Sequence, residues 1–115
     1  MGNETFGSAF EHFICNEIIA HCNYSGLNYP VSYWRTTSQF EVDFILGDHE
    51  AAIEVKGTQQ AGPHHVRGLL AFREEYSSKQ SIVVSCDPRP RRMGEIWVLP
   101  WEDFLKQLWS NKIMA

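Results

Sequence analysis

The stretch EVDFILGDHEAAIEVKG, residues 41–57, decides the fold of this chain. Its apolar and polar positions alternate in two runs joined by Gly47-Asp48-His49-Glu50. The pattern predicts a hairpin of strands Phe40–Leu46 and Ala51–Lys56, because successive side chains of a strand point to opposite faces. We expect one face to form the core, made of Phe40, Val42, Phe44, Leu46, Ala51, Ile53 and Val55. The opposite face carries Glu41, Asp43, Glu54 and Lys56.

The loop of this hairpin sets which charged residues oppose each other. Symmetric pairing around the four loop residues sets Asp43 opposite Glu54 and Glu41 opposite Lys56, with Cβ atoms about 5 Å apart. If Gly47-Asp48 is instead a two-residue loop, the register slides by two residues. The four side chains then still share a face, but they no longer oppose each other directly.

Two carboxylates at this distance repel each other unless a proton or a cation lies between them. A divalent cation, Mg²⁺ or Mn²⁺, is the natural occupant, because Mg²⁺ is bound by a few carboxylates together with water. Lys56 would then orient or deprotonate a water, or neutralise charge on a phosphate. The alternative is a solvated face with a Glu41–Lys56 ion pair. Asp43 favours the site, because aspartate is a poor strand former and stands in mid-strand.

The rest of the chain predicts a single α/β domain over residues 1–115. Its expected elements are helix Glu4–Cys22, strand Val31–Arg35, the hairpin, a helix over 63–77, strand Ser81–Ser85, strand Glu95–Leu99 and helix Trp101–Trp109. The order is α-β-β-β-α-β over residues 4–86, followed by a β-α tail over 95–110. We expect a mixed central sheet flanked by helices, with 81–85 parallel to a neighbour through a right-handed crossover.

Composition narrows the class of protein. The chain has 115 residues, 43% of them hydrophobic, and a net charge of −4, which indicates a folded domain without a general basic coat. No apolar run approaches the ~20 residues of a membrane span, and no secretory signal is visible. The odd number of cysteines, without CxxC spacing, disfavours zinc or a disulfide framework and favours the cytoplasm. The oligomeric state stays open.

The spacing D-x10-E-x-K, formed by Asp43, Glu54 and Lys56 between a leading and a second helix, resembles the PD-(D/E)XK nuclease superfamily. The resemblance covers residues 4 to about 86. The segments YWRT (33–36), EVDFIL (41–46), IEVKG (53–57) and LPWEDFLKQLW (99–109) are most similar to a nuclease-like domain of unknown function. That domain stands at the C-terminus of many prokaryotic AAA-type ATPases.

This resemblance implies a restriction-endonuclease-like αβββαβ core, with Asp43 and Glu54 as ligands of Mg²⁺ and Lys56 as the catalytic lysine. In such nucleases the leading helix often adds an acid, here Glu11. On a helical wheel Glu11 lies about 60° from Ile14, so we expect it to point at the edge of the sheet. Glu17, on the other side of the apolar stripe, is its surface counterpart.

Basic residues and histidines outside the hairpin indicate a binding role less strongly than the acids and the lysine of the hairpin do. Arg89, Arg91 and Arg92 form the densest basic patch, which predicts either contact with a nucleic-acid backbone or an ordinary soluble loop. His64-His65 is typical of a solvated helix terminus, with contact to a substrate near Lys56 as the alternative. His21 lies on an apolar stripe and is expected to be packed and hydrogen-bonded.

Two functions fit these features. The first is a Mg²⁺-dependent phosphodiesterase acting on DNA, with Asp43, Glu54, Lys56 and Glu11 in its site. The second is a catalytically inactive nucleic-acid-binding or regulatory module that serves an AAA-type ATPase. The chain has no GxxxxGK[ST] motif, so it does not bind ATP through a P-loop of its own.

Overall fold

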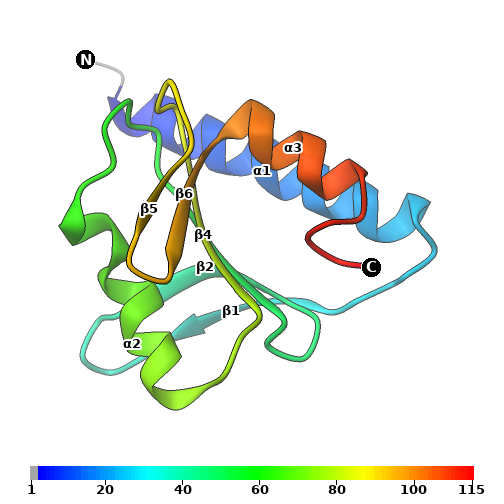
Figure 1. Cartoon of the computed structure of the whole chain (residues 1–115), viewed down its shortest axis with the longest axis horizontal. Coiled ribbons are helices and arrows are strands. Elements are labelled where there is room, and N and C mark those ends of the chain that lie inside the picture. Colours follow the sequence, from blue (N-terminus) through cyan, green and yellow to red (C-terminus); the bar gives the residue numbers. More distant parts are fainter. Residues whose placement is uncertain (1–2) are drawn as a thin grey trace.

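The computed structural model describes residues 3–115 as a six-stranded mixed sheet covered by helices on both faces (Figure 1). The elements in chain order are α1 (Asn3–Tyr24), β1 (Val31–Arg35), β2 (Glu41–Leu46), β3 (Ala51–Val55), η1 (Pro63–Val66), α2 (Arg67–Glu75), β4 (Gln80–Ser85), β5 (Arg91–Met93), β6 (Ile96–Pro100) and α3 (Trp101–Trp109). The strand order is β1-β2-β3-β4-β6-β5. The predicted α/β class and the order α-β-β-β-α-β are confirmed.

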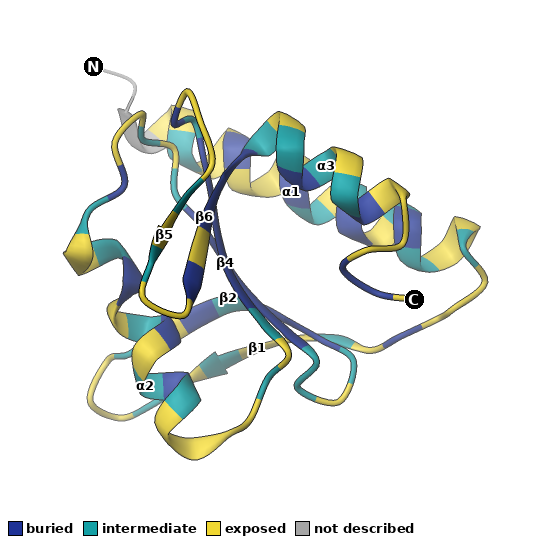
Figure 2. Ribbon diagram, viewed as in Figure 1, coloured by how far each residue is buried: buried dark blue, intermediate teal, exposed yellow. Residues whose placement is uncertain are grey.

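Each face of the sheet has its own apolar core. Phe10, Ile14 and Ile18 of α1 and Phe104 of α3 pack on one face, while Leu69 and Phe72 of α2 pack on the other face with Ile45 and Ala52. The central strands are accordingly buried over almost their whole length (Figure 2). A sheet covered on both faces needs apolar residues at successive positions, which explains the runs in β3 and β4.

The hairpin of β2 and β3 has the symmetric register. Phe44 pairs with Ile53 and Leu46 with Ala51, so residues 47–50 form the connection and the two-residue loop is wrong. Gly47 adopts φ 70° there, in the left-handed region that favours glycine. The sheet continues from β3 to β4 in parallel, with Ile53 opposite Ile82, as expected for a crossover through a helix.

A β-bulge in β2 changes the expected alternation. Ser32 of β1 pairs with Ile45, but Trp34 pairs with Val42, so β2 contains one residue more than β1 over this interval. Val42 therefore packs in the core beneath α2 together with Ile45. The prediction that Val42 shares a face with Phe44 and Leu46 was wrong, because a pattern of period two does not reveal an inserted residue.

Other differences concern short elements. The predicted helix over 63–77 begins as the 3-10 turn η1 and ends at Glu75. The basic loop contains the short strand β5, which pairs with β6 in antiparallel fashion.

His21 is buried between the hydroxyl of Tyr29 and the side-chain oxygen of Asn111, as expected. No helix among residues 3–115 is both long and apolar enough to span a membrane.

Candidate active site

The carboxylates of Asp43 and Glu54 lie where the backbone pairing of β2 and β3 ends. There they accept hydrogen bonds from backbone N–H groups in place of the carbonyls of the neighbouring strand. The last paired residues are Phe44 and Ile53. Beyond them the backbone N–H of Asp43 donates to Glu54 Oε1 at 2.9 Å, and the backbone N–H of Val55 donates to Asp43 Oδ2 at 2.8 Å. Each carboxylate is thus fixed through one oxygen. The second oxygen of each receives no backbone hydrogen bond from residues 3–115.

The environment of Glu54 favours its protonated form. Its side chain is only 5% exposed, and it lies beside Asp43, whose backbone N–H it binds. Burial, then the negative charge of Asp43 and the hydrogen bond between the two carboxyl groups, raise the pKa of Glu54 to about 8, although Lys56 acts in the opposite direction. The protonated form of Glu54 is therefore favoured at neutral pH, and a divalent cation would have to replace its proton.

Lys56 pairs with Glu54 rather than with Glu41. Its Nζ lies 3.4 Å from Glu54 Oε2, whereas Glu41 pairs with Arg35 at 3.5 Å. Burial lowers the pKa of Lys56, but the charges of Glu54 and Asp43 outweigh burial, so its pKa is raised overall. Lys56 is therefore a stable cation. The Glu41–Lys56 ion pair of the solvated-face alternative is not formed.

Glu11 approaches the pair from α1. It lines a cavity of about 320 Å³ together with Asp43, Glu41, Tyr33 and Arg35. Burial and the charge of Asp43 raise its pKa, against the effect of Lys56. It therefore lies near residues of β1, the edge strand of the sheet, and of β2.

Glu17, the surface counterpart of Glu11, accepts a hydrogen bond from the indole of Trp109 at 3.0 Å.

The three acids Glu11, Asp43 and Glu54 do not form a preassembled ligand set. Over the part of the chain that is described, no group of three or more His, Cys, Asp or Glu residues is arranged to hold a metal ion.

Glu54 and Lys56 line a second cavity of about 430 Å³. His64 and His65 of η1 and Arg67, the first residue of α2, line the same cavity. Glu41 lines both cavities, so they are neighbours. Asp43 lines the first cavity, whereas Glu54 and Lys56 line the second.

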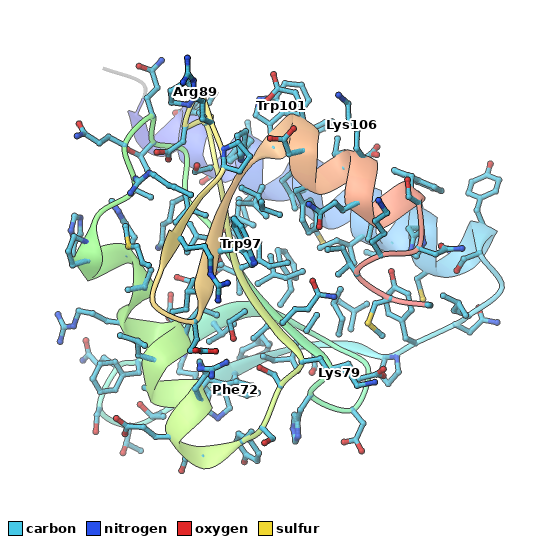
Figure 3. The ribbon with its side chains drawn as sticks, viewed as in Figure 1. Phe72, Lys79, Arg89, Trp97, Trp101 and Lys106 are labelled. Atoms are coloured by element: carbon cyan, nitrogen blue, oxygen red, sulfur yellow. The ribbon has the colours of Figure 1, made fainter. Side chains whose placement is uncertain are left out.

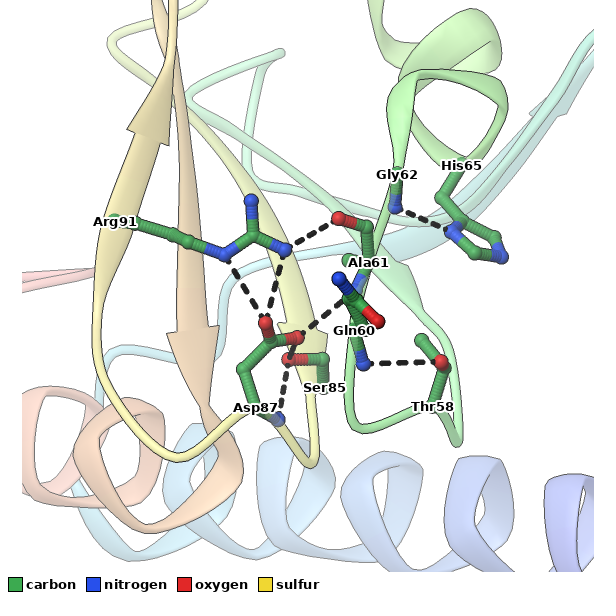
Figure 4. Close-up of polar contacts among 8 residues, drawn as sticks. All are labelled: Thr58, Gln60, Ala61, Gly62, His65, Ser85, Asp87 and Arg91. Atoms are coloured by element: carbon green, nitrogen blue, oxygen red, sulfur yellow. Dashed lines mark hydrogen bonds and ion pairs between the residues drawn. The ribbon is translucent and has the colours of Figure 1, made fainter.

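The three arginines of the predicted basic patch lie in different surroundings. The guanidinium of Arg91 donates to Asp87 Oδ2 through Nε at 3.0 Å and Nη2 at 2.9 Å, and it also donates to the carbonyl of Ala61 (Figure 4). Arg92 lies over the ring of Trp97, 5.0 Å from its centroid. Arg89 is exposed at the end of the molecule where β4 ends (Figure 3).

Asp87 organises the loops that follow β3 and β4. It accepts hydrogen bonds from the hydroxyl of Ser85 at 2.6 Å and the backbone N–H of Ala61 at 3.1 Å (Figure 4). Burial alone would raise the pKa of Asp87, but these hydrogen bonds and Arg91 lower it overall. Arg91 therefore holds loops together, whereas Arg89 remains available to a ligand.

Sequence reasoning missed Arg67 and Gly68. A Cβ on Gly68 would lie 1.9 Å from the carbonyl oxygen of Glu41, so the start of α2 packs directly against the backbone of β2. The available signal was a glycine inside an apolar helical pattern, which often marks a close backbone approach.

Comparisons with known proteins identify a family but no activity. Residues 6–104 match the family model described as "Domain of unknown function (DUF4143)". No curated protein and no solved structure matches the chain.

Proposed function

Because the chain belongs to the DUF4143 family, whose function is unknown, we propose its function from the site itself: a PD-(D/E)XK-type, Mg²⁺-dependent phosphodiesterase acting on DNA. The observation that carries the proposal is the convergence of Asp43, Glu54 and Lys56 where β2 and β3 separate. The order of elements around this point agrees with the restriction-endonuclease-like core that the sequence resembles.

The donor atoms suit a divalent cation such as Mg²⁺ or Mn²⁺. Asp43 and Glu54 offer one carboxylate oxygen each that receives no backbone hydrogen bond, and Mg²⁺ is usually held by one or two carboxylates with water and phosphate oxygens. A cation held there would polarise a phosphodiester and activate water for its hydrolysis. Water and a phosphate oxygen of the substrate would complete the coordination of the cation.

Lys56 has an electrostatic role in this proposal. Its raised pKa makes it a poor general base, and its ammonium group lies beside Glu54, where a phosphate would approach the acids. It therefore stabilises negative charge that develops on the phosphate during displacement. Glu11 supplies a further acid from α1, on the side of Asp43.

The proposal is tested by nicking of supercoiled plasmid DNA in Mg²⁺ and Mn²⁺. We expect cleavage by the wild type that requires the cation and is lost in Asp43→Ala. Lys56→Ala should also lose cleavage, by about a hundredfold or more, while it retains cation binding. Asp48→Ala is the matched control, because Asp48 is an exposed acid in the connection of the same hairpin. Activity that survives in Asp43→Ala would contradict the proposal.

A second candidate is a catalytically inactive nucleic-acid-binding or regulatory module of an AAA-type ATPase. The hydrogen bonds that both carboxylates accept from backbone N–H groups favour it, because they give the two acids a structural role between the strands. In this case the wild type would cleave no form of DNA. Asp43→Ala would then act on folding alone, since the backbone N–H of Val55 would lose its partner.

A further inference from the structure

The second cavity, of about 430 Å³, contains a cation without an anionic partner. Among its charged lining residues, Glu54 pairs with Lys56, and Glu41 pairs with Arg35 from outside the cavity. Arg67 forms no ion pair with any residue of the described chain, and its guanidinium lies 5.6 Å from the ring centroid of Phe40. Arg67 is therefore a positive charge in this lining that no acid of the described chain pairs with, although the whole chain has a net charge of −4.

The fold holds Arg67 close to the acids. Gly68, its neighbour, lets the backbone of α2 approach the carbonyl of Glu41, where any side chain would collide. The ring of Phe40 supports the guanidinium from the strand side. This packing fixes the backbone beside Arg67, and Arg67 itself is exposed.

His65 adds an oriented donor to the same wall. Its Nδ1 accepts a hydrogen bond from the backbone N–H of Gly62 at 2.9 Å (Figure 4), so the proton of the neutral ring is on Nε2. The ring of His64 lies 3.8 Å from that of His65, centroid to centroid. An arginine, an imidazole N–H and the nearby ammonium of Lys56 form a set of donors that suits phosphate oxygens.

We propose that this cavity is the phosphate-binding pocket of the domain, in which Arg67, with His64 and His65, holds a phosphodiester of DNA beside Glu54 and Lys56. Gly68 is the positioning residue of the pocket. The inference rests on the proposed function for its substrate class, but it requires only binding and not cleavage.

The test is the affinity of the whole chain for a short, fluorescently labelled DNA duplex. Fluorescence anisotropy is measured over a range of salt concentrations, in EDTA and again in Ca²⁺, which also takes oxygen ligands. We expect Arg67→Gln to weaken binding by about tenfold and to reduce the slope of log affinity against log salt by about one. His65→Ala should weaken binding by a smaller factor. Arg67→Lys should keep the salt slope, because it keeps the charge.

Lys106→Gln is the matched control, because it removes one exposed positive charge from α3, on the other side of the sheet (Figure 3). It should bind DNA like the wild type. Equal binding by Arg67→Gln and the wild type would overturn the inference, as would a wild type that shows no saturable binding in either buffer. Melting curves of each variant confirm that it is folded.

The plasmid assay separates this inference from the proposed function. A wild type that binds DNA through Arg67 but cleaves nothing refutes the phosphodiesterase and leaves the phosphate pocket standing. If cleavage by the wild type depends on Asp43 but Arg67→Gln binds DNA as well as the wild type, the phosphodiesterase is supported and the phosphate pocket is refuted.

Discussion

Glu54 is the residue on which the candidate site depends most. It is buried beside another acid, and its nearest cation, Lys56, only partly offsets that burial. The crowding of Asp43 and Glu54 was expected from one of the two hairpin registers that the sequence left open, and the structure has that register. The hydrogen bonds that these carboxylates accept from backbone N–H groups were not predictable, because they require the strands to separate at one particular pair.

The raised pKa of Glu54 predicts a specific pH dependence of stability. Between its ordinary value of 4.5 and about 8, the folded state holds a proton that the unfolded state has released. The contribution of Glu54 to the free energy of unfolding therefore falls as the pH rises through this window. Glu54→Gln removes the titration and keeps an oxygen for the N–H of Asp43. We expect Glu54→Gln to be more stable than wild type by about 1–3 kcal/mol at the upper end of the window.

The measurement is urea unfolding at several pH values, without metal ions. Glu41→Gln is the control, because Glu41 is an exposed acid of the neighbouring strand, and it should keep the pH profile of the wild type. If Glu54→Gln and the wild type lose stability in parallel above pH 5, Glu54 is ionised in the folded domain and the assignment fails.

At the scale of elements, sequence periodicity predicted the long strands and helices well and the local irregularities poorly. The hairpin, β4 and α3 agree with their expected bounds to within one residue. The bulge in β2 and the short strand β5 were missed, since both depend on a neighbouring strand. The missed bulge includes Asp43, and it moves Val42 to the face covered by α2.

Gly68 gives the clearest prediction at this scale. In an exposed helix Gly→Ala usually stabilises, but here the added Cβ would lie 1.9 Å from the carbonyl oxygen of Glu41. We expect Gly68→Ala to lower the free energy of unfolding by about 1–3 kcal/mol, because α2 must move away from β2. Gly7→Ala, in α1, is the matched control. A Cβ there meets no atom within 4 Å, so it should stabilise by up to about 1 kcal/mol. Thermal unfolding of the two variants decides, and stabilisation by both would show that α2 does not pack this closely.

At the scale of the whole molecule, the candidate site lies where the two helical layers approach the same pair of strands. Glu11 reaches Asp43 from α1, and Arg67 faces Glu54 and Lys56 from α2. The sequence predicted the acids and the lysine because they lie within one hairpin. It did not predict the wall containing Arg67, because that wall depends on how a distant helix packs on β2.

This position ties a bound cation to the stability of the entire domain. A ligand that binds only the folded state raises the free energy of unfolding, by ~2.7 kcal/mol when its concentration is a hundred times Kd. Because the cation must displace the proton of Glu54, whose pKa is about 8, we expect Mg²⁺ or Mn²⁺ to raise Tm more at about pH 9 than at about pH 6. Asp43→Ala should abolish the rise at both pH values, while Lys56→Ala should retain it, because the ligands are acids. Asp48→Ala should respond like the wild type, which separates loss of a ligand from loss of one negative charge. A rise in Tm that persists unchanged in Asp43→Ala would show that the cation binds elsewhere, and Asp43 would then be a residue of folding rather than of catalysis.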